Sequence, residues 1–248
     1  MDTPEVMVLA ALRGDVQDAV GMYNVQESFE LEYISKLVSA WQGNTQPGDE
    51  QVSSGSSPCH LAASLGHLTA LRSLIENNSL SPDDPDNNGR TPIMMACAYG
   101  HLSVVRYLRE VCKVNIESSD VESMTPILMA AMFGHHHIVK YLSRWLAHKS
   151  GQYHYADKEL GGSILHWACL CGLSAGRLRM IGTCDNRYVE TVRFIVKELK
   201  VPINARTSSD DSTPLAWACG AMPLTATKKK IVEMLVYYGA DVHAVDNT

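Results

Sequence analysis

The residues of this chain best suited to binding a metal ion are three consecutive histidines, His135, His136 and His137, and the cysteines Cys169 and Cys171. Consecutive residues of a helix point in different directions, so three adjacent histidines cannot readily share one ion. The two cysteines have no second pair at the spacing of a zinc site. We therefore expect no metal ion and no cofactor.

The motifs of common catalytic sites are also missing from the sequence. It contains no glycine-rich phosphate loop, no G-x-S-x-G turn around a nucleophilic serine and no H-E-x-x-H motif. We therefore expect no catalytic residue and no enzymatic activity from this chain alone.

An internal repeat supplies the elements that position these residues. Segment 57–67, SPCHLAASLGH, returns in register at 91–101 and at 125–135, so the starts are 34 residues apart. Weaker copies begin at Ser163 and Thr213, and a degenerate copy lies near the N-terminus. A period near 33 residues around a T-P-L-H-x-A core is typical of the ankyrin repeat. The chain thus resembles the ankyrin family, most strongly over 57–142.

This resemblance implies an all-α fold, a solenoid of helix-turn-helix units joined by hairpin-like loops. In the family, a Thr-Pro or Ser-Pro pair opens the first helix of each repeat, and a glycine ends it. The histidine of T-P-L-H, here His60 and His166, bridges backbone groups of neighbouring tips. The helix-ending glycines are Gly66, Gly100, Gly134 and Gly172. The cysteines expected in the core as small apolar residues are Cys97, Cys169 and Cys219.

We expect a single domain over 1–248, because a solenoid grows by adding repeats to one continuous core. It comprises about five full repeats and an atypical N-terminal one. The atypical repeat covers 1–23, an insertion with an extra helix covers 24–56, the full repeats start near 57, 91, 125, 163 and 213, and further insertions lie at 174–187 and 223–230. The last residues resemble the start of another hairpin, which favours a protein that continues beyond Thr248.

Composition suggests a soluble protein of a reducing compartment. Hydrophobic residues make up 46% of the chain and the net charge is −6. No leader peptide is recognisable in the first residues, so we expect none, and the sequence has no uninterrupted run of 18 apolar residues. We expect a cytoplasmic or nuclear monomer that does not insert into membranes and whose main partner is not a nucleic acid.

Partners of ankyrin proteins are gripped by the hairpin tips and by the exposed face of the inner helices. The resemblance therefore implies an apolar groove, because exposed apolar side chains are the usual anchors of an interface. The expected partner-binding residues are Leu65, Tyr99, Met124, Met132, Phe133, Arg90 and Trp167. The alternative is that these side chains pack between repeats, and for Trp167 core packing and groove contact remain equally open.

Acidic residues mark the hairpin tips, which favours a partner segment that carries apolar anchors together with Lys or Arg. These residues are Asp83, Asp84, Asp86, Glu117, Asp120, Glu122, Asp157, Glu159, Asp210 and Asp211.

The insertions of the fourth and fifth repeats are basic and form a candidate second site for an acidic protein, a phosphoinositide or nucleic acid. Its residues are Arg177, Arg179, Arg187, Lys228, Lys229 and Lys230. The alternative is two solvated loops. Resemblance further implies that Asn115 and Asn204, with His243 in the fifth repeat, match the positions that asparaginyl hydroxylases modify.

Three functions fit these features. The first is a non-enzymatic module that binds a protein segment in its groove. The second is the substrate-recognition region of a larger enzyme or ubiquitin-ligase assembly. The third is a bacterial or viral effector that acts in the cytosol of a host cell.

Overall fold

The computed structural model describes residues 55–77, 79–150, 156–157, 160–170, 186–220 and 225–247. The expected atypical repeat at 1–23 and the extra helix of 24–56 lie outside the described residues, as do Cys171, Gly172 and most of the insertion at 174–187. The backbone divides into two compact units, and the first ends at Val121 while the second begins at Glu122. The expectation of a single domain therefore stays a prediction.

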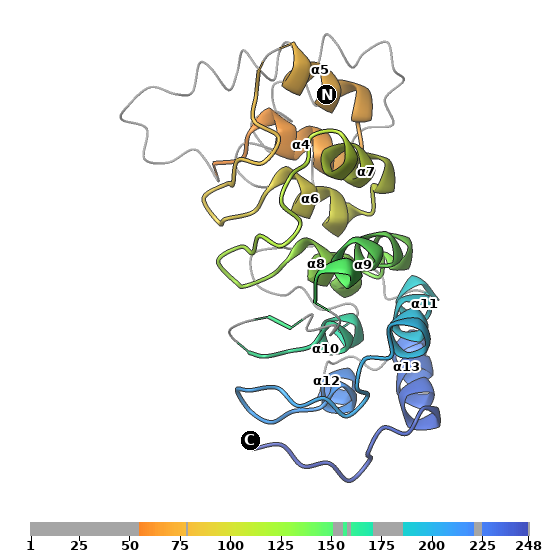
Figure 1. The fold of residues 1–248 in the computed structure, drawn as a ribbon. Helices are drawn as coiled ribbons and strands as arrows, with labels where there is room; N and C mark the ends of the chain where they lie inside the picture. The colour runs from red at the N-terminus through yellow and green to blue at the C-terminus, as the bar shows by residue number, and fades with distance from the viewer. Residues whose placement is uncertain are drawn as a thin grey trace, which may run out of the picture. The chain divides into compact units, whose positions relative to one another are not determined.

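The described residues of unit 1 form two helix-turn-helix repeats (Figure 1). Its helices are α4 (Pro58–Leu65), α5 (Leu68–Glu76), α6 (Pro92–Tyr99) and α7 (Leu102–Glu110). Helices α4 and α6 pack on one another as an inner layer, and each is followed by an antiparallel outer helix. The outer helices bury one apolar face, so that Leu71 and Leu74 of α5 and Val104, Val105 and Leu108 of α7 have no exposed surface.

Local signals explain where the inner helices of unit 1 begin and end. The residue before each helix, Ser57 or Thr91, has extended backbone, and proline occupies the first helical position, where its missing N–H is harmless. Gly66 and Gly100 end the two helices with φ values of 76° and 87°. The expected cap residues and helix-ending glycines of α4 and α6 are therefore found in place.

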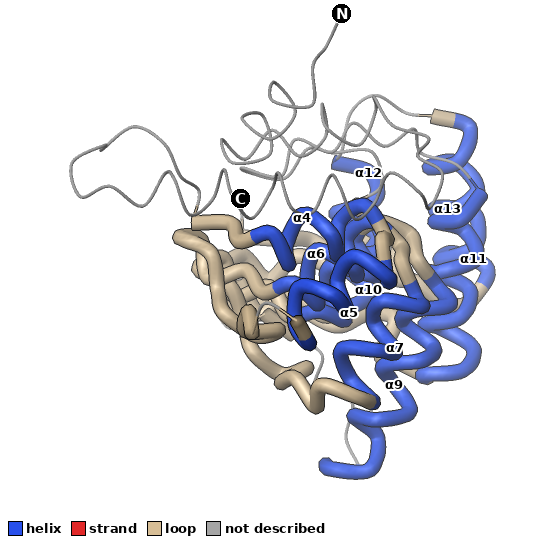
Figure 2. Tube along the Cα trace, turned by 90° about the horizontal axis from the view of Figure 1, so that it is seen from above, coloured by secondary structure: helices blue, strands red, loops and turns tan. Residues whose placement is uncertain are grey.

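The described residues of unit 2 form the same two layers over three repeats. Helices α8 (Pro126–Met132), α10 (Ile164–Cys169) and α12 (Pro214–Gly220) form the inner layer. The outer layer consists of α9 (His136–Ser150), α11 (Asn186–Phe194) with the π-helix η2 (Ile195–Leu199), and α13 (Ala226–Tyr237). Helix α11 lies between α9 and α13 (Figure 2). All described regular elements are helical apart from one isolated bridge, Ala156 with Ser163, which confirms the all-α class.

Unit 2 departs from the sequence-based expectation in three places. The predicted insertion at 223–230 is wrong from Ala226 onward, because Thr225 Oγ1 accepts the Lys228 N–H at 3.2 Å and caps α13 there. Helix α8 ends at Met132, two residues before Gly134. Cys219 is exposed, unlike the buried Cys97 and Cys169, because it lies in α12, the last inner helix that the structure describes.

Candidate functional site

The hairpin tip of the second repeat, residues 86–90, is fixed by a single aspartate. The Asp86 carboxylate accepts the backbone N–H groups of Asn88 and Arg90, both at 2.8 Å, and the Asp86 N–H donates to the Arg90 carbonyl at 2.7 Å. Gly89 completes the turn with a φ of 74°, a value that glycine adopts without strain. A hairpin tip is thus found at Asp86, one of the acidic residues expected at the tips.

His60 joins the first inner helix to the next tip. Its Nδ1 accepts the Ser57 N–H at 3.1 Å, and its Nε2–H donates to the Arg90 carbonyl at 2.8 Å. One accepting and one donating nitrogen describe a neutral ring protonated at Nε2. Burial lowers the pKa of His60, which favours this neutral form.

His166 repeats this arrangement in unit 2. Its Nδ1 accepts the Ser163 N–H at 3.1 Å, and its Nε2–H donates to the Ser212 carbonyl at 3.1 Å. Burial also lowers the pKa of His166. The expected bridging role of both histidines is therefore confirmed.

A further histidine bridge was not predicted. His101 Nε2–H donates to the carbonyl of Ser64 at 2.8 Å, which ties the outer helix of the second repeat to the end of α4. The imidazole lies directly over Gly66, where a Cβ atom would collide with its Nδ1. The recurring Gly-His pair of the sequence was the available signal for this contact.

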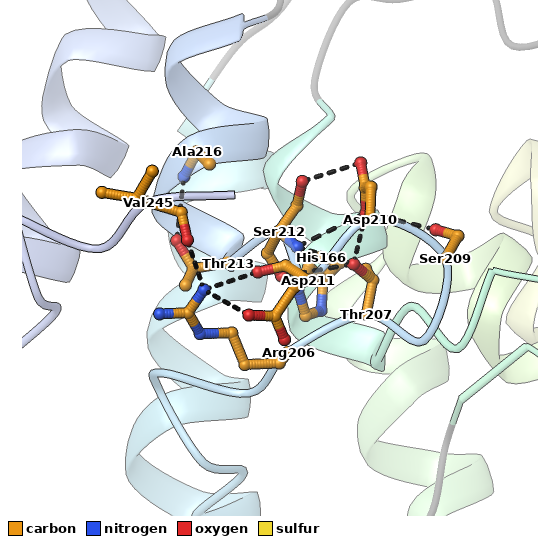
Figure 3. A network of polar contacts seen from close by, with 10 residues as sticks. All are labelled: His166, Arg206, Thr207, Ser209, Asp210, Asp211, Ser212, Thr213, Ala216 and Val245. Atoms are coloured by element: carbon orange, nitrogen blue, oxygen red, sulfur yellow. Dashed lines mark hydrogen bonds and ion pairs between the residues drawn. The ribbon is translucent and has the colours of Figure 1, made fainter. Parts of the chain in front are cut away.

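In unit 2, a polar network holds the tip formed by residues 206–213 (Figure 3). The Asp210 carboxylate accepts the hydroxyl of Thr207 at 2.5 Å and that of Ser212 at 2.8 Å. These hydrogen bonds lower the pKa of Asp210 to about 2. Arg206 Nη1 donates to the carbonyls of Asp211 and Val245, both at 2.7 Å, and so ties this tip to the C-terminal segment.

Several of the acidic tip residues that were expected to face a basic partner are instead buried or hydrogen-bonded within the fold. Asp86, Asp120 and Asp157 are buried, and Asp210 is hydrogen-bonded within its own tip. At Asp86 and Asp157 the carboxylate accepts backbone N–H groups of its own tip, which holds it inside the fold. Glu159 lies outside the described residues. The remaining tip acids, Asp83, Asp84, Glu117, Glu122 and Asp211, are half-buried or exposed.

Most of the expected groove residues are buried, which is a correction. The exposed fractions are 7% for Arg90, 3% for Met124, 4% for Met132, 6% for Phe133 and 8% for Trp167. The alternative of packing inside the fold therefore describes them better than an exposed ladder does. Leu65 and Tyr99, at the ends of α4 and α6, remain half-buried.

The side chain of Tyr99 lies near the positive charge of Arg90. Burial raises the pKa of Tyr99 to about 12, and the positive charge of Arg90 acts in the opposite direction. The Arg90 side chain is itself mostly buried, with its Nε 3.7 Å from Asp120 Oδ2. Leu65 and Tyr99 thus form the accessible part of the predicted groove in unit 1, next to the buried Arg90.

The role of Trp167 is settled in favour of packing. Its indole N–H donates to Asp157 Oδ2 at 3.1 Å, and its ring meets Trp217 edge-on at 5.4 Å. The same carboxylate accepts the N–H groups of Leu160 at 2.6 Å and Gly162 at 2.8 Å. Trp167 therefore packs the base of its own tip, whereas Trp217 stays half-buried.

The predicted basic second site is partly reassigned. Lys228 is buried in the first turn of α13, so it cannot belong to an exposed loop. Lys229 and Lys230 are exposed on the same helix, and Lys230 Nζ donates to Asn186 Oδ1 of α11 at 3.3 Å. Arg187 is exposed on α11, while Arg177 and Arg179 lie outside the described residues.

Neither the histidine run nor any other described cluster forms a metal site. His135 is buried and His136 is exposed, and the described residues contain no group of three potential ligands. Asn115 and Asn204 are both exposed. Asn204 Oδ1 accepts the Asp241 N–H at 2.9 Å and Asn115 Oδ1 accepts the Glu117 N–H at 3.0 Å. Their hydroxylation remains a prediction.

Comparison with known proteins connects this architecture to a family. Models of the ankyrin repeat match residues 22–120, as three copies, and residues 210–247. A search of curated proteins finds no match. A chain in the solved structure of the predatory endopeptidase Bd0816 from Bdellovibrio bacteriovorus in complex with immunity protein Bd3460 is similar at 21% identity, with a TM-score of 0.54. The similarity covers 78% of this chain and 86% of that one, and at this identity it supports the fold alone.

Proposed function

Because this chain belongs to the ankyrin-repeat family, we propose that it is a non-catalytic protein-binding module that holds a partner segment at Leu65 and Tyr99 of unit 1. Ankyrin repeats are interaction modules and are generally not catalytic. The specific surface rests on the observation that these two predicted groove residues stay accessible while the others are buried.

Position supports a shared role for Leu65 and Tyr99. They are the last residues of α4 and α6, which pack on each other as neighbouring inner helices. Aromatic and apolar side chains of this kind are common anchors at interfaces, where they give most of the binding free energy. An apolar side chain of the partner would pack against both.

The charges next to this surface are nearly balanced, which favours a partner segment that binds through an apolar, uncharged side chain. Asp86 and Asp120 of the adjacent tips are buried. The guanidinium of Arg90 lies close enough to Tyr99 to influence its pKa. Arg90 is itself buried and pairs with Asp120, so its charge is largely cancelled and gives little preference between an acidic and a basic partner group.

Affinity capture from cell lysate with the wild-type chain and a Tyr99→Ala variant tests the proposal. We expect the specific partner to be lost with the variant, since removing a central aromatic anchor costs about 2 kcal/mol or more. Val111→Ala is the matched control, because Val111 is 61% exposed in the same unit but lies after α7, away from Tyr99.

Thermal melting must accompany this experiment. Retention of the same partners by folded Tyr99→Ala protein would contradict the proposed surface. The variant Phe133→Ala is unsuitable as a binding probe, because truncating an aromatic ring that is 6% exposed leaves a cavity and costs about 3–5 kcal/mol of stability.

A further inference from the structure

The outer helices of unit 2 carry a positive charge that the protein-binding surface does not use. Among the described residues of α9, α11, η2 and α13, together with Lys200, eight Lys and Arg side chains are exposed against three Glu. The cations are Lys140, Arg144, Arg187, Arg193, Lys197, Lys200, Lys229 and Lys230, and the acids are Glu190, Glu198 and Glu233. We call this surface the outer basic face. It stands out in a chain whose net charge is −6.

Helix α9 is the most strongly cationic element of this face. Its sequence, His136–Ser150, contains no Asp or Glu. Exposed residues recur one turn apart at His136, Lys140 and Arg144, and therefore form one stripe along the helix. Lys140 and Arg144 make no ion pair among the described residues, whereas Arg193 pairs with Glu190 at 2.6 Å and Lys229 with Glu233 at 3.9 Å.

Aromatic residues border this stripe. Tyr141 and Trp145 are also one turn apart, their rings meet edge-on at 6.4 Å, and Trp145 is 40% exposed. Rings with one apolar and one polar part, next to long Lys and Arg side chains, suit the headgroup level of a bilayer. On the opposite side of α9, the buried residues Ile138, Val139 and Leu142 hold the helix to the fold.

From these features we propose that the outer basic face binds the surface of an anionic lipid bilayer. The cations are spread over three neighbouring helices, with α11 between α9 and α13 (Figure 2). A single nucleic-acid strand is usually held along a groove, whereas a layer of this kind fits a laterally extended partner. Each Lys or Arg near an anionic leaflet raises the binding constant about fivefold.

Binding to the surface of a bilayer agrees with two other features of the molecule. No described helix is long and apolar enough to span a membrane. In unit 2 the acidic tips and the outer helices lie at opposite edges of each repeat, with the inner helices between them (Figure 1). Salt at physiological concentration screens charges beyond about 8 Å, so the tip acids oppose binding only weakly.

Cosedimentation with vesicles tests this proposal. The chain should bind vesicles in which about a third of the lipid is phosphatidylserine, should not bind pure phosphatidylcholine, and should dissociate as salt is raised. The variant Lys140→Gln/Arg144→Gln should weaken binding about 30-fold. The control Arg106→Gln/Lys113→Gln removes the same charge from exposed positions of unit 1 and should change binding by less than about twofold.

The proposal would be overturned if the two double variants bound the vesicles equally, or if binding did not depend on the charge of the lipid. Tighter binding to an oligonucleotide or to polyglutamate than to the anionic vesicles would also overturn it, because the partner would then be another polyanion. Circular dichroism of both variants verifies that they are folded. Tyr99→Ala should bind vesicles like the wild type, which separates this surface from the proposed protein-binding one.

Discussion

At the scale of single residues, three histidines hold successive helices and tips together. His60, His101 and His166 each donate from Nε2 to a carbonyl of a neighbouring repeat, at distances from 2.8 to 3.1 Å. All three have a pKa lowered from 6.5, with burial as the main cause. The neutral ring is thus the form that the fold uses.

This leads to a prediction on pH. These histidines bind protons more readily in the unfolded chain than in the folded one. The free energy of unfolding should therefore keep its full value above about pH 6.5 and fall as the pH drops below it. Urea unfolding at a series of pH values measures this slope. The variant His60→Gln/His166→Gln should be less stable at neutral pH and have a flatter slope, and an unchanged slope would show that other groups cause it.

Trp167 supplies a second prediction at this scale. The variant Trp167→Phe keeps most of the apolar volume but removes the N–H that donates to Asp157 Oδ2. Because hydrogen bonds to charged groups contribute about 1.5–3 kcal/mol, we expect a loss of that order in urea unfolding. Trp217→Phe, at the half-buried partner ring, should lose clearly less. Equal losses would mean that ring packing, and not the hydrogen bond, matters at Trp167.

At the scale of elements, the ends of the inner helices could be predicted from sequence because their signals are local. A Ser or Thr followed by Pro, and a Gly eight residues later, define α4 and α6 without reference to the rest of the fold. The start of α13 was missed because Thr225 caps it without a following proline. Three successive lysines then suggested an exposed loop, whereas helix formation buries Lys228.

The end of α4 gives a prediction at this scale. Gly66→Ala places a side chain on a backbone with a φ of 76° and drives its Cβ into the ring of His101. We expect a loss of about 2 kcal/mol or more in urea unfolding. Gly220→Ala is the control, since Gly220 lies in α12 and an added Cβ would meet no atom within 4 Å, so this variant should be neutral or slightly stabilising. Similar losses for both variants would contradict this interpretation of the α4 cap.

At the scale of the whole molecule, the fold could be predicted much better than the binding surface. The repeat period alone indicated the all-α architecture, because each repeat carries the same local signals. Exposure of a side chain depends instead on what packs over it, and this is not encoded in the period. Met132 and Phe133 therefore occupy groove-like positions in the pattern and are nevertheless buried.

The outer basic face, too, can be recognised only from the folded molecule as a whole. The outer basic face combines residues from 140 to 230, which are far apart along the chain and come together because α9, α11 and α13 form one layer. The acid-free run at 136–150 was visible in the sequence and could have pointed to α9. The contributions of α11 and α13 required the packing of the helices.

The proposed function depends above all on whether unit 1 binds a partner protein at Leu65 and Tyr99. Site-specific crosslinking measures this contact, with a photoreactive phenylalanine analogue placed at position 99 or, as a control, at position 111. We expect a partner that crosslinks from position 99 and not from position 111. A partner that crosslinks from position 111 alone, or equally from both, would contradict the proposed surface.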